Sequence, residues 1–276
     1  MTAMTTWILL RGLTRESAHW GSFVADFERA LPGHGVTALD LPGNGLLNLV
    51  PSPTTVAGMV AECRAELVRR GVAPPYHLLA MSLGAMVATE WARVAPHEVS
   101  GCVLINTSFK PFSPFYQRLR PRNYPALLGV VVRRASAEQV ERTVLRLTSH
   151  RAAELDSVVA QWAQVRRSRP VSASNALRQL AAAARYRAPA TAPTARVLLL
   201  GSERDGLVNG QCSTAIAKAW RVPLRLHPRA GHDLPLDDGH WVVEQVRLWL
   251  ADIDGHIDSD APAETNAGDQ ADGACT

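Results

Sequence analysis

The sequence predicts an α/β protein in which a mostly parallel sheet is flanked by helices and a helical lid is inserted into the chain. Three observations indicate this class. Short apolar runs of strand length recur along the chain, and segments with helical periodicity alternate with them. One long segment, 109–192, interrupts this alternation. Strands that alternate with helices form parallel sheets covered on both faces, and 47% apolar with 20% charged residues fits a globular chain of 276 residues.

The first third of the chain sets up the alternation with two strands and two helices. We expect strands over 6–10 and 36–39 and helices over 20–31 and 56–67. The first helix ends at Pro32-Gly33, and Thr54 or Thr55 can cap the second. A glycine-rich loop follows the second strand, and its first residue, Asp40, is expected to be structural.

The stretch around Ser82 changes abruptly from strand to helix. An apolar segment over 76–81 suits a buried strand, and the apolar residues after Ser82 follow one helical stripe. Small residues stand two positions away on both sides, Ala80 and Gly84, as a tight turn requires. Such a turn exposes a hydroxyl above the sheet, and the new helix directs its unpaired N–H groups toward it. The turn therefore predicts that Ser82 is a nucleophile and that the Leu83 N–H can bind an oxyanion.

The second half of the chain continues the alternation after the interruption. We expect strands over 101–106, 196–201 and 224–227 and helices over 209–220 and 241–250. The interrupting segment carries helical patterns and several prolines, but no stretch suited to a central sheet. We therefore expect a core of residues 1–108 and 193–251, a helical lid over 109–192, and a disordered acidic tail over 252–276.

Two polar residues in the second half can complete the chemistry of Ser82. A serine hydroxyl becomes a good nucleophile only when a base accepts its proton and a third group orients the base. Both partners must follow strands, because the carboxyl ends of parallel strands meet at one edge of a sheet. Asp205 and His232 each follow an expected strand, and the chain order Ser, Asp, His suits this architecture. The sequence thus predicts a triad of Ser82, Asp205 and His232.

Neighbouring polar residues offer alternatives to the acid and the histidine. Glu203 lies on the same loop as Asp205 and could replace it, whereas the other candidate histidine, His240, lies at the start of the last helix. Asp233 and Asp237 are expected to cap a helix or a turn.

These motifs, in this order, resemble the α/β-hydrolase superfamily over residues 6–251. The resemblance also includes the glycine-rich loop after the second strand and Gly12 after the first. It implies that the Leu13 N–H joins the Leu83 N–H in an oxyanion hole. Members of the superfamily often have His-Gly at this point, whereas this chain has Arg11-Gly12. The substitution keeps the backbone donor.

The expected activity is hydrolysis of carboxylic esters with a small or medium acyl group, through an acyl-enzyme. The triad needs no cofactor, and no residues show metal-ligand spacing. His19 and Trp20 either pack the oxyanion loop or bind substrate. The resemblance leaves open a C–C bond hydrolase, a cofactor-free haloperoxidase and an esterase that demethylates acyl groups on acidic carrier proteins. A hydrolase-fold protein that binds without turnover is the alternative from another class.

The distribution of charges and cysteines limits the possible partners and the cellular compartment. The segment 109–192 has fifteen basic and four acidic residues, so it is either solvated helix surface or a site for an anionic substrate or an acidic carrier protein. We expect a small-molecule ester substrate and no nucleic-acid partner, because this segment has few aromatic residues to stack bases. We expect no membrane partner, because no apolar run is long enough to span a bilayer and no strongly apolar exposed helix is visible in the lid. Four scattered cysteines and no visible secretory signal favour the cytoplasm.

Overall fold

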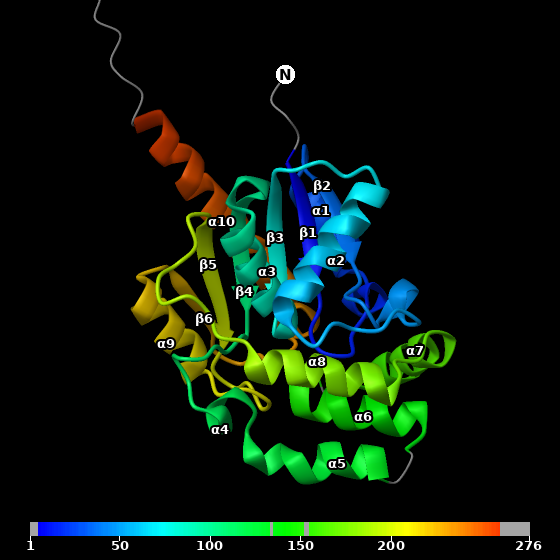
Figure 1. Cartoon of the computed structure of the whole chain (residues 1–276). Coiled ribbons are helices and arrows are strands. Elements are labelled where there is room, and N and C mark those ends of the chain that lie inside the picture. Colours follow the sequence, from blue (N-terminus) through cyan, green and yellow to red (C-terminus); the bar gives the residue numbers. More distant parts are fainter. Residues whose placement is uncertain (1–4, 133–134, 152–154, 260–276) are drawn as a thin grey trace, which may run out of the picture.

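The computed structural model describes residues 5–132, 135–151 and 155–259 and contains one six-stranded sheet (Figure 1). Its strands follow the order β2-β1-β3-β4-β5-β6, and every pair is parallel. This confirms the predicted α/β class. The strands are β1 (Thr6–Leu10), β2 (Gly35–Leu39), β3 (Tyr76–Met81), β4 (Val99–Ile105), β5 (Arg196–Ser202) and β6 (Leu224–His227).

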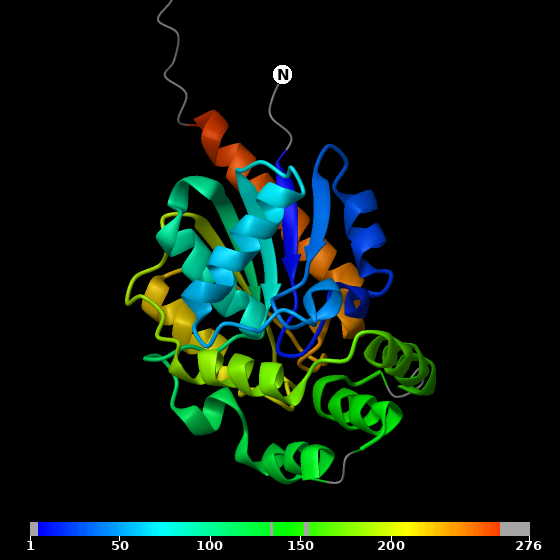
Figure 2. The ribbon, with the colours of Figure 1, turned by 45° about the vertical axis from the view of Figure 1, so that its right-hand side comes forward.

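Helices cover both faces of the sheet. Figures 1 and 2 show α2 and α3 on one face and α1 and α10 on the other. The helices of these two layers are α1 (Phe23–Ala30), α2 (Val56–Arg69), α3 (Leu83–Val94), α9 (Gln211–Trp220) and α10 (Leu234–Ser259), with 3₁₀ turns η1 (Ser17–Trp20), η2 (Gly45–Leu47) and η3 (Pro96–Glu98). Thr55 caps α2, because its hydroxyl accepts the Gly58 N–H at 3.1 Å.

The apolar core is divided by the sheet into two clusters. Successive strand residues point to opposite faces, so Ile8 packs with α2 and α3 whereas Trp7 packs with α1 and α10. Cys63 and Cys102 are buried small residues of the first cluster, as predicted, and burial raises the pKa of both thiols to about 12.

The last helix differs from the sequence expectation at its start and at its end. α10 begins at Leu234 rather than near Trp241, and a non-helical residue, Asp238, divides it. Asp238 caps the longer part by accepting the Trp241 N–H at 3.0 Å. The helix continues to Ser259, so it includes the first residues of the expected disordered tail. The rest of that tail, from residue 260, lies outside the described residues.

A helical insertion lies between β4 and β5 in the chain. Its helices are α4 (Phe115–Arg118), η4 (Pro121–Asn123), α5 (Tyr124–Val132), α6 (Ala137–Thr148), α7 (Leu155–Ser168) and α8 (Ala173–Arg185). Figures 1 and 2 place them below the carboxyl ends of the strands, in green. Within the described part of this segment, only an isolated bridge between Lys110 and Arg187 has β pairing. The helical content agrees with the sequence, whereas the domain boundaries and the role of a lid stay predictions.

Charged side chains join the insertion to the sheet. Glu141 on α6 is fully buried and accepts hydrogen bonds from Arg15 on the loop after β1 and from Arg166 on α7, both at 2.5 Å. Glu16 likewise pairs with Arg169 at the end of α7. These carboxylates are buried but paired, which burial of a charge requires.

None of the helices in the described ranges combines the length and the apolar character needed to cross a membrane.

Candidate active site

Ser82 lies at the turn between β3 and α3 in a strained backbone conformation. Its φ of 55° and ψ of −116° are unusual for a residue with a side chain, and such outliers are found where surrounding structure enforces them. Part of this surrounding structure is the close approach of α3 to β1. A Cβ atom on Gly84 would stand 2.6 Å from the carbonyl oxygens of both Leu10 and Arg11. The predicted need for a small residue after Ser82 is therefore confirmed at Gly84.

The loop after β1 lies directly beside Ser82. A Cβ atom on Gly12 would be 3.1 Å from the Ser82 Cβ and 3.6 Å from its Oγ. Leu13 follows on this loop, and Leu83 begins α3. Among the described residues, neither the Leu13 nor the Leu83 N–H has a protein hydrogen-bond acceptor. The geometry thus brings the two predicted oxyanion donors to the turn that carries the serine, and their role stays a prediction.

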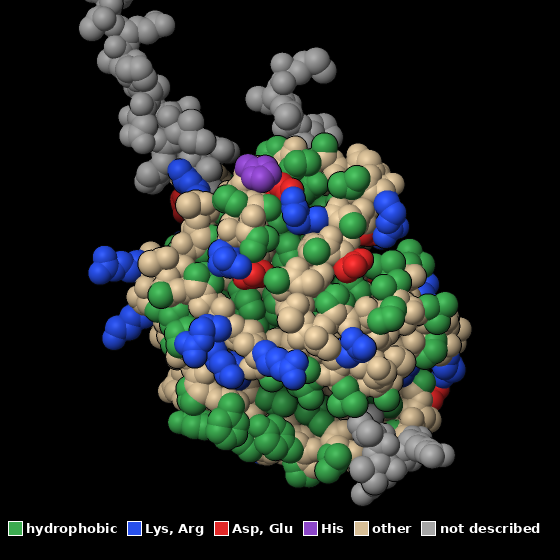
Figure 3. Space-filling view, in the orientation of Figure 1, with side chains coloured by type: hydrophobic (Ala, Val, Ile, Leu, Met, Phe, Trp, Pro, Cys, Tyr) green, Lys and Arg blue, Asp and Glu red, His purple; other side chains and the backbone are tan. Residues whose placement is uncertain are grey.

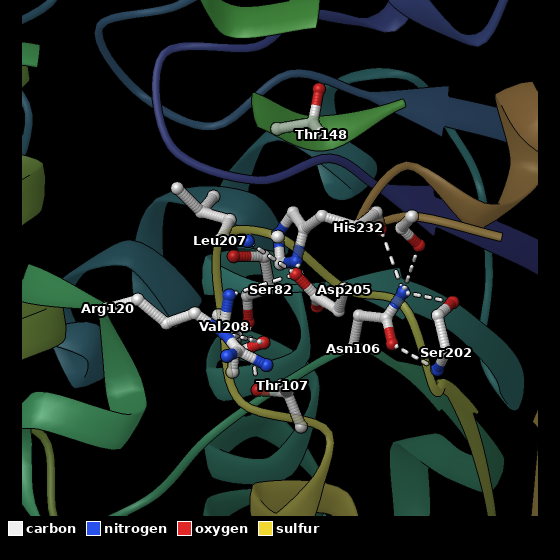
Figure 4. Close-up of polar contacts among 12 residues, drawn as sticks. Ser82, Asn106, Thr107, Arg120, Thr148, Ser202, Asp205, Leu207, Val208 and His232 are labelled. Carbon is white, nitrogen blue, oxygen red and sulfur yellow. Dashed lines mark hydrogen bonds and ion pairs between the residues drawn. The ribbon is translucent and has the colours of Figure 1, made fainter. Parts of the chain in front are cut away.

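Asp205 and His232 are in direct contact. The Asp205 Oδ2 lies 2.7 Å from the His232 Nδ1, and both side chains are buried (Figure 4). The second carboxylate oxygen, Oδ1, accepts the backbone N–H groups of Leu207 at 2.8 Å and Val208 at 2.9 Å. One carboxylate oxygen is therefore fixed by its own loop, and the other oxygen orients the imidazole. Glu203, the alternative acid, is exposed.

The surroundings of His232 favour its protonated form overall. Burial alone lowers the pKa of an imidazole, and Arg11 acts in the same direction. The charge of Asp205, its hydrogen bond and the charge of Asp233 oppose this, and they raise the pKa of His232 above its usual value of 6.5. A histidine in this environment is a stronger base than a free imidazole.

Two residues at the end of β4 tie the Ser82 turn to the His232 loop. The Thr107 hydroxyl donates to the Ser82 carbonyl at 3.1 Å. The Asn106 amide donates to the His232 carbonyl at 2.9 Å and accepts the Ser202 N–H at 2.8 Å (Figure 4). Asn106 has a φ of 44°, so this central side chain stands on a backbone conformation that asparagine tolerates better than most residues. Neither residue was predicted from the sequence, although both are polar and directly follow an apolar strand.

Arg11 and Asp233 form a buried ion pair beside the site. The guanidinium donates through Nη1 to Oδ1 at 3.1 Å and through Nη2 to Oδ2 at 2.6 Å. Asp233 does stand directly before α10, and its carbonyl accepts the Leu236 and Asp237 N–H groups, but its carboxylate binds this guanidinium instead of capping the helix. Asp237 does have the expected role, since it accepts the backbone N–H groups of Gly231 and His150.

His19 and Trp20 are buried between the loop after β1 and the insertion. The His19 Nδ1 accepts the Glu16 N–H at 3.1 Å, and its ring meets Trp162 of α7 edge-on at 5.0 Å. Burial first, and then Arg15 and Arg11, hold the pKa of His19 well below its usual value. Trp20 stacks on Arg11, whose guanidinium carbon lies 4.8 Å from the ring centre. Both side chains therefore pack the loop, and substrate binding by them stays a prediction.

Two further observations concern grooves and metal ligands among the described residues. An open groove of about 570 Å³ includes Tyr76 at the amino end of β3, which is opposite to Ser82. No cluster of three or more histidine, cysteine or acidic residues in the described ranges could hold a metal ion.

The sequence and the fold define the class of this protein. The sequence model of the alpha/beta hydrolase family matches residues 7–245, and the chain belongs to this family. A thermophilic esterase from Thermogutta terrifontis has a similar structure, with a TM-score of 0.70, 20% sequence identity and coverage of 90% of each chain. The 2-hydroxy-6-oxo-6-phenylhexa-2,4-dienoate hydrolase from Rhodococcus sp. strain RHA1 is also similar, with a TM-score of 0.66, 18% identity and coverage of 89% of each chain. At these identities the likeness concerns the fold.

A curated relative matches a shorter part of the chain. The pimeloyl-[acyl-carrier protein] methyl ester esterase of Methylococcus capsulatus is 36% identical over 100 residues. The match covers 36% of this chain and 35% of that protein, about a third of the length of each.

Proposed function

We propose that this protein is a serine hydrolase that cleaves carboxylic esters with small or medium acyl groups. Ser82 is the nucleophile, His232 the base and Asp205 the group that orients the base. The hydrogen bond of 2.7 Å between Asp205 and His232 carries the proposal, because it fixes the imidazole with Nδ1 as the donor and leaves Nε2 free to accept a proton. Ser82 lies at the same edge of the sheet, because it follows β3, the neighbour of β4. Asn106, at the end of β4, donates a hydrogen bond to the His232 loop.

In the first step, the His232 Nε2 accepts the proton of the Ser82 hydroxyl while Oγ forms a bond to the ester carbonyl carbon. The carbonyl oxygen becomes an oxyanion, which the Leu13 and Leu83 N–H groups stabilise. The tetrahedral intermediate then breaks its bond to the alcohol oxygen, which takes the proton from His232. The acyl group remains on Ser82.

In the second step, His232 accepts a proton from water, and the hydroxyl attacks the acyl carbon. The second tetrahedral intermediate releases the carboxylic acid, and the proton returns to the Ser82 oxygen. The raised pKa of His232 makes the imidazole a ready proton acceptor and predicts that activity falls as the pH drops through a value above 6.5.

Nitrophenyl esters of increasing acyl length, assayed on the wild type and Ser82→Ala, test this proposal. Ser82→Ala should lower kcat by about 10⁶-fold, and a fluorophosphonate probe should label the wild type but not this variant. Ser22→Ala, which changes an exposed serine, is the control and should retain activity. A folded wild-type protein with no ester turnover and no label at Ser82 would support C–C bond hydrolysis or binding without turnover instead.

A second candidate function is demethylation of acyl groups on an acidic carrier protein. The partial match to the methyl ester esterase favours it, as does the basic excess of the insertion. Figure 3 shows basic side chains gathered over α8 and few acidic ones near them. An acidic carrier would bind such a surface through long-range attraction, which speeds encounter more than it strengthens the complex.

Exposed arginines provide the test of this second candidate. Arg118 and Arg120 donate to the carbonyls of Ala183 and Val208, so their replacement would also disturb packing. Arg122 is exposed, and its bond to the Gly206 carbonyl is long, at 3.5 Å, so it suits a charge reversal better. Arg122→Glu should weaken turnover of a carrier-bound methyl ester and leave nitrophenyl esters unaffected, whereas Arg29→Glu on the distant α1 should change neither. Equal losses on both substrates would exclude carrier docking at this position.

A further inference from the structure

Arg11 and Asp233 each stand next to a residue of the proposed site. Arg11 precedes Gly12 and Leu13, and Asp233 follows His232. The two residues are 222 positions apart in the chain, yet their side chains form two parallel hydrogen bonds and are 3% and 5% exposed. A planar guanidinium that meets a carboxylate in this way fixes orientation as well as distance.

Contacts with neighbouring elements fix the positions of both Arg11 and Asp233. The Arg11 carbonyl lies against the first turn of α3, where a Cβ atom on Gly84 would be 2.6 Å away. The Arg11 side chain also lies on the Trp20 ring. On the other loop, the Asp233 N–H donates to the Thr148 carbonyl at the end of α6 at 2.7 Å. The pair is thus a short, buried link between two otherwise separate loops.

We propose that Arg11 and Asp233 are positioning residues, whose ion pair holds the loop that presents the Leu13 amide against the loop that presents the His232 imidazole. This inference rests on the proposed function, because it assigns the pair to that same site. Arginine at this point fits the assignment, since its fork can bind both carboxylate oxygens at once, which a lysine cannot do.

The two partners also act on His232 in opposite directions. The groups that act on this imidazole come from three loops: Asp205 after β5, Arg11 after β1 and Asp233 on its own loop. Burial lowers the pKa of His232 most strongly, Asp205 and Asp233 raise it, and Arg11 lowers it. Removing either charge should therefore shift the titration of His232 in a direction that identifies the charge removed.

The experiment combines the pH profile of kcat/KM with NMR titration of the His232 ring, which requires no turnover. Asp233→Asn should move both titrations to lower pH, and Arg11→Gln should move both to higher pH. Each should lower kcat by up to about 10²-fold through misplacement of the loops, with a smaller change in KM. Arg11→Lys separates the two effects, because it keeps the charge but loses the fork. It should lower kcat and leave the titration of His232 unchanged.

Two further variants keep the inference testable if single changes unfold the protein. The double variant Arg11→Met/Asp233→Leu replaces the pair with apolar side chains, a change that buried ion pairs often tolerate. It should fold and still lose kcat. Glu98→Gln breaks another multiply bonded arginine pair, with Arg64 at the amino end of the sheet, and should change neither kcat nor the titration of His232.

Three results would overturn the assignment. The first is a wild-type kcat in the folded double variant, and the second is a loss of kcat in Arg11→Gln that Arg11→Lys fully restores. The third is a His232 titration that neither single charge removal shifts. Failure of the proposed function is distinguishable from these, because it appears as absent labelling of Ser82 in the wild type, whatever the NMR titration shows.

Discussion

The sheet meets two sets of helices, and the two interfaces differ in chemistry. Apolar side chains join the sheet to its flanking helices, with Trp91 of α3 and Phe27 of α1 fully buried. At the insertion, buried ion pairs add to apolar contacts such as that of Ala182 on α8, and Glu141 is fully buried between Arg15 and Arg166. Apolar packing loses stability gradually as contacts are removed. A buried charge that loses its partner destabilises the fold strongly, so the second interface depends on a few residues.

Of the three stability predictions, Glu141→Gln should have the largest effect. It leaves the buried Arg15 guanidinium without its carboxylate, and loss of one partner of a buried pair costs about 3–5 kcal/mol in the free energy of unfolding. Urea unfolding measures it. Glu138→Gln on the same helix is the matched control: Glu138 also pairs with an arginine of α7, but both side chains are about half exposed. It should cost far less than Glu141→Gln, because solvent screens an exposed ion pair, and equal losses in the two variants would contradict the contrast.

Acid should also destabilise the apolar interface between the sheet and its flanking helices, through His77 on β3. Burial first, and then His34, lower the pKa of His77 to about 4, and its ring stacks on Trp7 at 4.8 Å. The folded protein therefore resists protonation that the unfolded chain accepts. This contribution is present above pH 6.5, and about 3 kcal/mol of stability is lost as the pH falls from 6.5 to 4.

His77→Phe checks this assignment, because it keeps an aromatic ring but removes the titration. Urea unfolding at several pH values should show a shallower loss of stability below pH 6.5 in His77→Phe than in the wild type. His97→Gln, which changes an exposed histidine, should leave the slope unchanged. An unchanged slope in His77→Phe would assign the acid sensitivity to other groups, such as His19 at the charged interface.

Gly84→Ala should have the smallest effect of the three on stability. Its added Cβ meets backbone oxygens, which cannot swing away, and overpacking of this kind costs about 1–3 kcal/mol. Gly129→Ala on α5 is the counterpart in the insertion, where an added Cβ meets nothing within 4 Å. Because alanine favours a helix over glycine by up to about 1 kcal/mol, this variant should be neutral or more stable. Thermal unfolding compares the two, and a neutral Gly84→Ala would show that α3 can move away from β1.

The apolar side of this comparison was predictable from the sequence. Strand-length apolar runs and helical stripes repeat locally, so β1 to β6 could be located without knowledge of the fold, and the cap of α2 could be narrowed to Thr54 or Thr55, of which the structure has Thr55. The turn at Ser82 and the loops of Asp205 and His232 were also found, because chain order and strand ends determine which loops share an edge.

The charged side was not predictable in the same way. A charged residue shows no periodicity that identifies its partner, and Arg15 pairs with Glu141 across 126 positions of sequence. Asp233 was assigned to a cap because local capping is the commonest role of an aspartate after a turn, whereas its true partner, Arg11, is far away in the chain. The early start of the last helix was missed for a similar reason, because the break at Asp238 hides the continuity.

The position of the insertion in the chain has a consequence for biosynthesis. The turn of Ser82 and the loop of Gly12 precede the insertion, whereas Asp205 and His232 both follow it. A nascent chain that has just emerged through α8 can pair β1 to β4, yet it lacks the acid and the imidazole. On the proposed mechanism, the growing polypeptide therefore has no hydrolase activity until β5, β6 and the loops of Asp205 and His232 have been translated and added to the edge of the sheet.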